Sequence, residues 1–364
     1  MADDTKIEWT DATVNFWWGC TKVGPGCDGC YAEAWDRRAG GAHWGQGVPR
    51  RKIKSAVQTL HRLDNGYSWW AADHAIGKIN PTLRRRVFLQ SMSDMFDLEV
   101  PLDWFREAWE TIEACDRLAL QILTKRVSAV EKRLDAIGRT EWPQHAGLMI
   151  TVVNQPEAAR DVPRLLALKE RLRIPWVGLS CEPLLGPIDL RPWLPGCYEC
   201  AEECGWRSGT APPEDVCHAC GWIGTNAGEF CCRCGKQDFG SVCPRCEANA
   251  VHQHPDTPTL DWVIAGGESG GGARPPPDGG FDSLRDQCTA AGVAFFLKQH
   301  GEWIGVRDLR NLPGGGGPGF GAYDHCPYDR EAEAVRVGKR RAGRMLDGQV
   351  WDQIPATHQE GANR

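Results

Sequence analysis

The chain has 364 residues, a formal net charge of −6 and 41% hydrophobic residues. Its length allows a large buried core without covalent cross-links, its hydrophobic content excludes a disordered chain, and its acidity excludes a protein that is basic throughout and coats nucleic acid. The 17 cysteines therefore need an explanation other than the disulfide scaffold of a small secreted domain.

The first residues carry no basic segment followed by an apolar run, so we expect no secretory signal, and no stretch approaches the length of a membrane span. We therefore expect a cytoplasmic protein with no membrane partner. In a reducing compartment, closely spaced cysteines are typical ligands of metals or clusters.

Short apolar runs alternate with helical stretches along most of the chain. We predict strands at 86–91, 118–124, 147–154, 176–180, 260–266 and 293–298, and helices at 101–115, 127–137 and 157–172. The runs are mostly continuous, which is typical of parallel strands that are buried on both faces. The pattern predicts an α/β fold, either a partial or full (β/α) barrel or an open doubly wound sheet.

Polar side chains follow the predicted strands. The residues at these carboxyl ends include Ser91, Ser93, Asp94, Lys125, Glu182 and Glu268. The carboxyl ends of parallel barrel strands share one face, where active sites are built, so we expect a polar active-site mouth there.

Three cysteines near the N-terminus, Cys20, Cys27 and Cys30, form a C-x6-C-x2-C loop that is rich in glycine. A structural zinc ion would need a fourth ligand, and the nearest candidate is His43. A [4Fe–4S] cluster on three thiolates instead leaves one iron open. S-adenosylmethionine (SAM) can bind that iron through its amino and carboxylate groups and yield a 5′-deoxyadenosyl radical.

Several motifs, found in a fixed order along the chain, resemble those of a known protein family. They are Lys6–Thr13 ahead of the cysteines, Ser91–Phe96, Leu123–Arg126, Cys181–Pro187, Gly266–Gly270 and Lys298–Gly301. Together they resemble a family of predicted radical SAM proteins that is common in phage genomes. The resemblance implies a partial (β/α) barrel of radical SAM type and an electron donor such as flavodoxin or ferredoxin.

Some of these relatives occur in phage gene clusters that hypermodify thymidine. There a radical SAM isomerase is thought to convert a glycine joined through nitrogen to the thymine methyl carbon into the carbon-linked form. The resemblance therefore implies glycyl-thymidine isomerisation in DNA that carries a modified base, in the cytoplasm of the host.

The chain departs from the usual superfamily pattern in two ways. The cysteine spacing is wider than C-x3-C-x2-C, and Gly266-Gly267-Glu268 follows a late strand rather than the second. Ser91, Ser93 and Asp94 occupy the second-strand position. We expect one of these two sets to bind the SAM amino group, and the choice between them stays open.

Three strand-end residues are candidates for catalysis: Cys181, Glu182 and Lys125. The Cys181 thiol would donate hydrogen to a substrate radical or ligate a cluster. The alternative for a single cysteine is a small buried residue of the core.

Residues 192–258 form a cysteine-rich insertion between an N-terminal part, 1–191, and a C-terminal part, 259–364. Two predicted four-thiolate sites comprise Cys197, Cys200, Cys217 and Cys220, and Cys231, Cys234, Cys243 and Cys246. The spacing favours two zinc ions in zinc-ribbon-like folds over auxiliary iron–sulfur clusters. In a barrel we expect the insertion to emerge on the catalytic face. Its acidic residues outnumber its basic ones, so a lid or a protein contact is favoured over a nucleic-acid finger.

Positive charge gathers in two acid-free segments. Arg50, Arg51, Lys52 and Lys54 lie in the first, and Arg336, Lys339, Arg340, Arg341 and Arg344 in the second. We expect the first segment to contact DNA, with a solvated surface as the alternative.

Two other functions stay open for the whole protein: a non-catalytic zinc-binding protein, and a radical SAM enzyme that acts on RNA, protein or a small metabolite.

Overall fold

The computed structural model describes residues 4–66, 84–195, 258–305 and 334–355, and the short antiparallel pair β8 (Val216–Cys217) and β9 (Trp222–Ile223). Seven parallel strands form its main sheet. They are β1 (Ala12–Val14), β4 (Arg86–Leu89), β5 (Ala119–Thr124), β6 (Ala146–Thr151), β7 (Val177–Cys181), β10 (Trp262–Gly266) and β11 (Ala294–Gln299).

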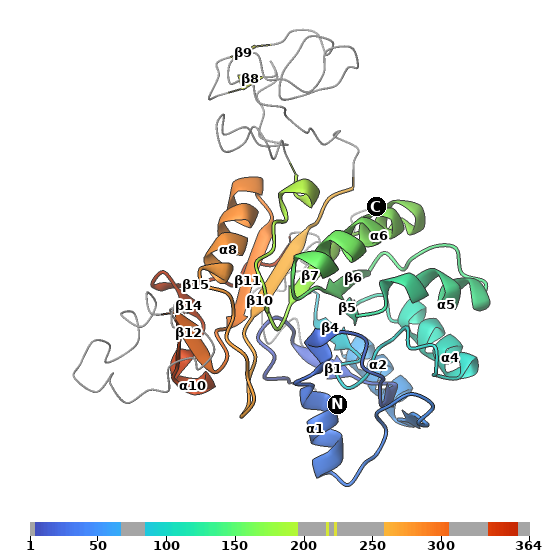
Figure 1. Cartoon of the computed structure of the whole chain (residues 1–364). Helices are drawn as coiled ribbons and strands as arrows, with labels where there is room; N and C mark the ends of the chain where they lie inside the picture. The colour runs from blue at the N-terminus through green and yellow to red at the C-terminus, as the bar shows by residue number, and fades with distance from the viewer. Residues whose placement is uncertain are drawn as a thin grey trace.

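The strand order distinguishes between the two predicted architectures. Each strand of the sheet pairs with the next one in chain order, β1-β4-β5-β6-β7-β10-β11, and every pairing is parallel. A doubly wound sheet reverses its order at a switch point, and this sheet does not. The sheet curls into a half-barrel (Figure 1), so the predicted α/β class and partial barrel are confirmed.

Helices cover the convex face of the sheet (Figure 1). They include α2 (Ala56–Asn65), α4 (Leu102–Ala114), α5 (Val130–Ala136), α6 (Gln155–Leu172) and α8 (Gly280–Ala291). The helix predicted at 157–172 begins two residues earlier than expected. The Asn154 side chain caps it by accepting a hydrogen bond from the Glu157 amide at 3.0 Å.

Both faces of the sheet are buried, which explains the continuous apolar runs. Val87, Leu89, Leu120 and Ile122 belong to the main core shared with the helices. The concave face holds a second, aromatic cluster: Trp9, Phe88, Met149, Trp176, Trp262, Ile264 and Phe296. Side chains from alternate positions thus fill the inside of the curl.

Short elements complete the described chain. They are β2 (Trp17–Trp18), η1 (Pro25–Cys27), α1 (Tyr31–Arg38), β3 (Arg51–Lys52), η2 (Val127–Ala129), η3 (Arg191–Trp193), β12 (Trp303–Gly305), β13 (Ala334–Arg336), α10 (Lys339–Ala342), β14 (Met345–Leu346) and β15 (Gln349–Val350). The chain near Trp351 runs along the edge of β11, because the Leu297 amide donates to the Trp351 carbonyl at 2.9 Å. Among the described residues, no helix is both long and apolar enough to cross a membrane.

The expected position of the insertion is wrong. After β7 the chain returns across the sheet to Trp193, whose carbonyl accepts from the Leu260 amide at 3.0 Å. The next amide, Asp261, donates to Val177, the first residue of β7, at 3.0 Å. The two ends of the insertion therefore lie at the amino ends of the strands, opposite the face where it was expected. The eight predicted zinc ligands lie outside the described residues, apart from the strand position of Cys217 in β8.

Candidate active site

A cavity of about 130 Å³ lies at the carboxyl ends of β4, β5 and β6, and we name it the cysteine cavity. Its lining contains all three loop cysteines, Cys20, Cys27 and Cys30. It also contains four of the predicted strand-end residues, Ser91, Ser93, Asp94 and Lys125. The structure thus brings together residues that are up to 131 positions apart in the sequence, from Cys20 to Thr151.

The loop that carries the cysteines is bonded directly to the segment after β4. The Gly19 amide donates to the Met92 carbonyl at 3.3 Å, and the Ser93 hydroxyl donates to the Trp17 carbonyl at 3.0 Å. The Tyr31 hydroxyl, just after Cys30, donates to the Ser91 carbonyl. Ser91 and Ser93 therefore contribute to the loop's position as well as to the cavity wall.

Two glycines at this loop lie in close contact with neighbouring groups. Gly19 has a φ of +105°, and a Cβ there would lie 2.4 Å from the His43 carbonyl oxygen. A Cβ on Gly29 would lie 2.6 Å from a carboxylate oxygen of Glu268. A side chain at Gly19 would displace the backbone at His43, and one at Gly29 would displace the Glu268 carboxylate.

Arg126 connects the strand end to the first cysteine. Its guanidinium donates to the Cys20 sulfur at 3.3 Å and to the Thr21 carbonyl at 2.7 Å, and it pairs with Asp94 at 3.1 Å. Asp94 also accepts from Thr124 and from the Lys125 amide. The Asp94 carboxylate thus holds Arg126, which in turn holds the cysteine loop.

This setting affects the ionisation of the thiol. Burial, together with the nearby Asp94 carboxylate, raises the pKa of Cys20 to about 12, against the opposing effect of Arg126. Without a bound cation the thiol is therefore protonated at neutral pH. Because a metal binds the thiolate form, binding at Cys20 would release a proton.

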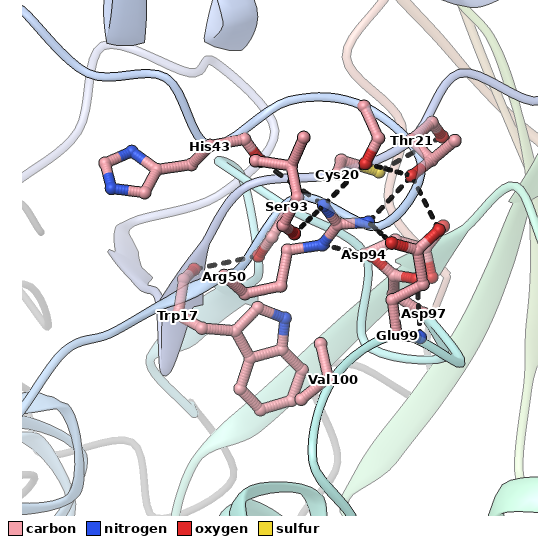
Figure 2. Close-up of polar contacts among 12 residues, drawn as sticks. Trp17, Cys20, Thr21, His43, Arg50, Ser93, Asp94, Asp97, Glu99 and Val100 are labelled. Atoms are coloured by element: carbon pink, nitrogen blue, oxygen red, sulfur yellow. Dashed lines mark hydrogen bonds and ion pairs between the residues drawn. The ribbon is translucent and has the colours of Figure 1, made fainter.

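A buried arginine supports the loop from below (Figure 2). The side chain of Arg50 is fully buried and donates to Asp97 at 2.9 Å and to the Thr21 hydroxyl at 2.7 Å. It also donates to the carbonyls of His43, Gly45 and Val48. A guanidinium enclosed in this way does not reach a phosphate, so the predicted DNA contact of Arg50 is corrected to a structural role.

The other three residues of that basic segment lie nearer the surface. Arg51 is exposed, with its guanidinium 5.4 Å from the centre of the Trp18 ring. The Lys52 ammonium pairs with Glu107 at 2.5 Å, and Lys54 is exposed. None of the four lines the cysteine cavity.

The Gly266-Gly267-Glu268 motif lies beside the cysteine cavity but does not line it. Both carboxylate oxygens of Glu268 accept from Arg274, at 2.7 and 2.9 Å. Arg274 also donates to Asp28 at 3.0 Å and to the Pro25 carbonyl at 2.9 Å, inside the cysteine loop. The motif therefore fixes the loop through Arg274, whereas Ser91, Ser93 and Asp94 are the set that reaches the cavity.

We expect Arg274→Gln to loosen the cysteine loop and to lower the unfolding free energy by about 1–2 kcal/mol, because Glu268 is left nearly buried without its partner. Urea denaturation and the rate of limited proteolysis near Asp28 measure the effect. The control is Arg160→Gln, which removes a half-exposed pair with Asp161 on α6. Equal changes in the two variants would contradict the role given to Arg274.

The predicted catalytic residues differ in their placement. The Lys125 ammonium lines the cysteine cavity and donates to the Thr151 hydroxyl at 2.8 Å. Glu182 lies further along the same edge, where it pairs with Lys298 at 3.0 Å. Cys181 is fully buried in the main core and near Cys288, and burial raises the pKa of its thiol. We therefore assign Cys181 to packing, the alternative given above.

Gln90 and Arg274 were not singled out from the sequence, and Arg126 was predicted only as one of the polar residues at the strand ends. Arg126 falls in a quoted motif, but its partner is 106 positions away, and the Arg274–Asp28 pair spans 246 positions. Within the described ranges, no group of three His, Cys, Asp or Glu side chains is arranged to hold a single metal ion.

Comparison with known proteins gives a family and no named relative. Searches of curated proteins and of solved structures gave no match. A family model described as protein of unknown function, DUF5131, matches residues 4–355, nearly the whole chain. The chain, with its half-barrel and its cysteine cavity, belongs to the DUF5131 family.

Proposed function

We propose that this protein is a radical SAM enzyme in which Cys20, Cys27 and Cys30 hold a [4Fe–4S] cluster. The observation that carries the proposal is the shared cavity. Three cysteines from the segment that follows β2 line it together with polar residues that follow parallel strands of a half-barrel. In parallel barrels this is the face on which active sites are built.

The donor set suits a cluster of this kind. The loop from Cys20 to Cys30 contains three thiols and one carboxylate. That carboxylate belongs to Asp28, and it pairs with Arg274. In a cubane cluster each thiolate binds a different iron, so the cysteines surround a body larger than one ion. When bound, the cluster supplies the electron that cleaves SAM at its open iron and gives a 5′-deoxyadenosyl radical.

An unpaired polar group is a second observation that favours the binding of a ligand in the cysteine cavity. Gln90 lines the cavity with only 2% of its surface exposed, and its side-chain oxygen accepts from the Phe16 amide at 2.6 Å. Its Nε2 group has no hydrogen-bond partner in the described part of the chain. A buried donor of this kind is unfavourable unless something in the cavity accepts from it.

We expect Gln90→Glu to weaken SAM binding about tenfold, because the variant keeps the acceptor for Phe16 and replaces the donor with a second acceptor. Isothermal titration of the reconstituted protein with SAM measures this. Gln144→Glu, whose side chain contacts carbonyls at the amino edge of β6, is the control. Unchanged affinity in Gln90→Glu would remove Gln90 from the binding site.

Lys125 is the residue best placed to act on a bound anion. Its ammonium uses one donor on Thr151 and has two more available by its chemistry. We assign it to binding a carboxylate of SAM or of the substrate. Ser91, Ser93 and Asp94 are preferred over Gly266, Gly267 and Glu268 for the SAM side of the cavity.

We further propose that the substrate is a hypermodified thymidine in phage DNA, rearranged by glycyl-thymidine isomerisation, with electrons from a flavodoxin or ferredoxin. The motif resemblance described above supports this substrate.

The cysteine-rich insertion is proposed to bind two zinc ions. Each zinc ion would be bound by four cysteines that come from two C-x2-C motifs.

Anaerobic reconstitution with iron and sulfide tests the function. We expect about four iron atoms and four sulfides per chain in the cluster, about two zinc ions, and 5′-deoxyadenosine when SAM and a reductant are added. A chain that binds zinc alone and never cleaves SAM would overturn the proposal and would indicate a structural zinc protein. Cleavage of SAM without change in glycyl-thymidine DNA would overturn the substrate only.

A further inference from the structure

A second cavity, of about 490 Å³, lies at the carboxyl end of β11, and we name it the basic cavity. Its lining contains four cationic side chains, Lys298, Lys339, Arg340 and Arg344, and one carboxylate, Glu8. Lys298 belongs to β11, whereas the other three come from α10 and the turn after it. Segments separated by about forty residues thus place positive charge around one hollow.

The cations are held in different ways. The Arg344 guanidinium lies 4.8 Å from the centre of the Phe296 ring, and its Nε donates to the Leu297 carbonyl at 3.3 Å, so its position is fixed before any ligand binds. Lys298 pairs with Glu182 at 3.0 Å. Lys339 and Arg340 are exposed, and no carboxylate in the described part of the chain pairs with them. The basic cavity is therefore surrounded by two cations that are held by the protein, Arg344 and Lys298, and by two that are available to a ligand, Lys339 and Arg340.

The basic cavity lies on the same edge of the sheet as the cysteine cavity. Lys298 pairs with Glu182 after β7, and Ser180 of β7 lies in register with Thr151 of β6, which lines the cysteine cavity. From β6 to β11 there are three strand spacings of about 4.8 Å, or roughly 15 Å along the sheet. This separation suits two parts of one extended substrate.

We propose that the basic cavity binds phosphates of a nucleic-acid strand whose modified base is treated in the cysteine cavity. Clustered lysines and arginines recognise phosphate oxygens without regard to sequence and position the strand. A base that reacts must leave its stack and extend away from the backbone, so backbone and base need separate sites. The inference extends the proposed substrate and moves the DNA contact from Arg50 and its neighbours to β11 and α10.

The test is fluorescence anisotropy with a labelled single-stranded DNA and the full chain, titrated at several salt concentrations. The variant is the double charge reversal Lys339→Glu and Arg340→Glu. Both side chains are exposed, so the fold is retained, which circular dichroism checks. We expect affinity to fall at least tenfold and the slope of log affinity against log salt to decrease by about one to two.

The matched control reverses Arg117 and Arg171, which are more than half exposed and belong to the amino edge of the sheet. It changes net charge equally, and we expect less than a twofold to threefold loss. Equal losses in the two double variants would overturn the inference, because the effect would then come from net charge alone. Thymidine monophosphate that competes as well as the strand would also overturn it.

This experiment is independent of the cluster. DNA binding that is lost in the Lys339 and Arg340 variant supports the basic cavity even if reconstitution fails and the proposed function is lost. Cleavage of SAM by a chain whose DNA affinity is unaffected by this variant keeps the proposed function and overturns the basic cavity.

Discussion

Cys27→Ala is expected to abolish the proposed cleavage of SAM. Cys27 is buried and is one of the three cysteines that line the cysteine cavity, and a cubane that loses one of three protein thiolates is no longer held with a single open iron. We expect the bound iron and sulfide to fall by more than half and 5′-deoxyadenosine formation to fall at least 100-fold, which corresponds to about 2.7 kcal/mol in activation free energy.

The matched control is Cys288→Ala. Cys288 is also buried, but it belongs to the core between the sheet and α8. Its loss removes one sulfur from packing and costs about 1 kcal/mol or less in stability, with the cluster retained. Visible absorption, iron analysis and chromatography of the nucleoside product measure both variants. Full activity in Cys27→Ala would contradict the assignment of the cysteine loop.

Arg50→Met will destabilise the protein by about 3–5 kcal/mol, because Asp97 then stays buried without its cationic partner. The carbonyls of His43, Gly45 and Val48 also lose a donor. Arg50→Lys will recover only part of this stability, since an ammonium has three donors where the guanidinium has five. Urea denaturation followed by tryptophan fluorescence measures the unfolding free energy.

Arg51→Met is the control for this prediction. Arg51 is the next residue and is exposed, so its loss should change stability by about 0.5 kcal/mol or less. If Arg50→Met were as mild as Arg51→Met, the network in Figure 2 would not support the cysteine loop. DNA binding that falls in Arg50→Met without loss of stability would restore the phosphate contact predicted from the sequence.

Much of the fold was predictable because the sheet is buried on both faces. In the runs around Val87, Leu120 and Ile264, the side chains that point to either face of the strand are apolar. This pattern predicts parallel strands that are buried on both faces. Local pattern could not choose between barrel and doubly wound sheet, because strand order depends on contacts far apart in the chain. The strand β1 was missed because it has three residues, too few for a periodic signal.

Some residues of the site could be predicted from the sequence. Ser91 was predicted from its position at the end of a strand, and Cys20 was predicted from the cysteine spacing. It was not predictable where burial decides the role. Arg50 looks like a surface charge in the sequence, yet its partners Asp97 and the loop carbonyls enclose it. The insertion was expected on the catalytic face because a barrel loop normally follows a strand end, but the chain first crosses back to Trp193.

The central claim is that three cysteines hold a cluster with one iron open to SAM. The most direct measurement is electron paramagnetic resonance of the reconstituted, reduced protein with and without SAM. We predict the signal of a reduced [4Fe–4S] cluster that changes when SAM is added and broadens when SAM carries ¹⁷O in its carboxylate. A signal that SAM leaves unchanged, or no cluster signal at all, would contradict the claim.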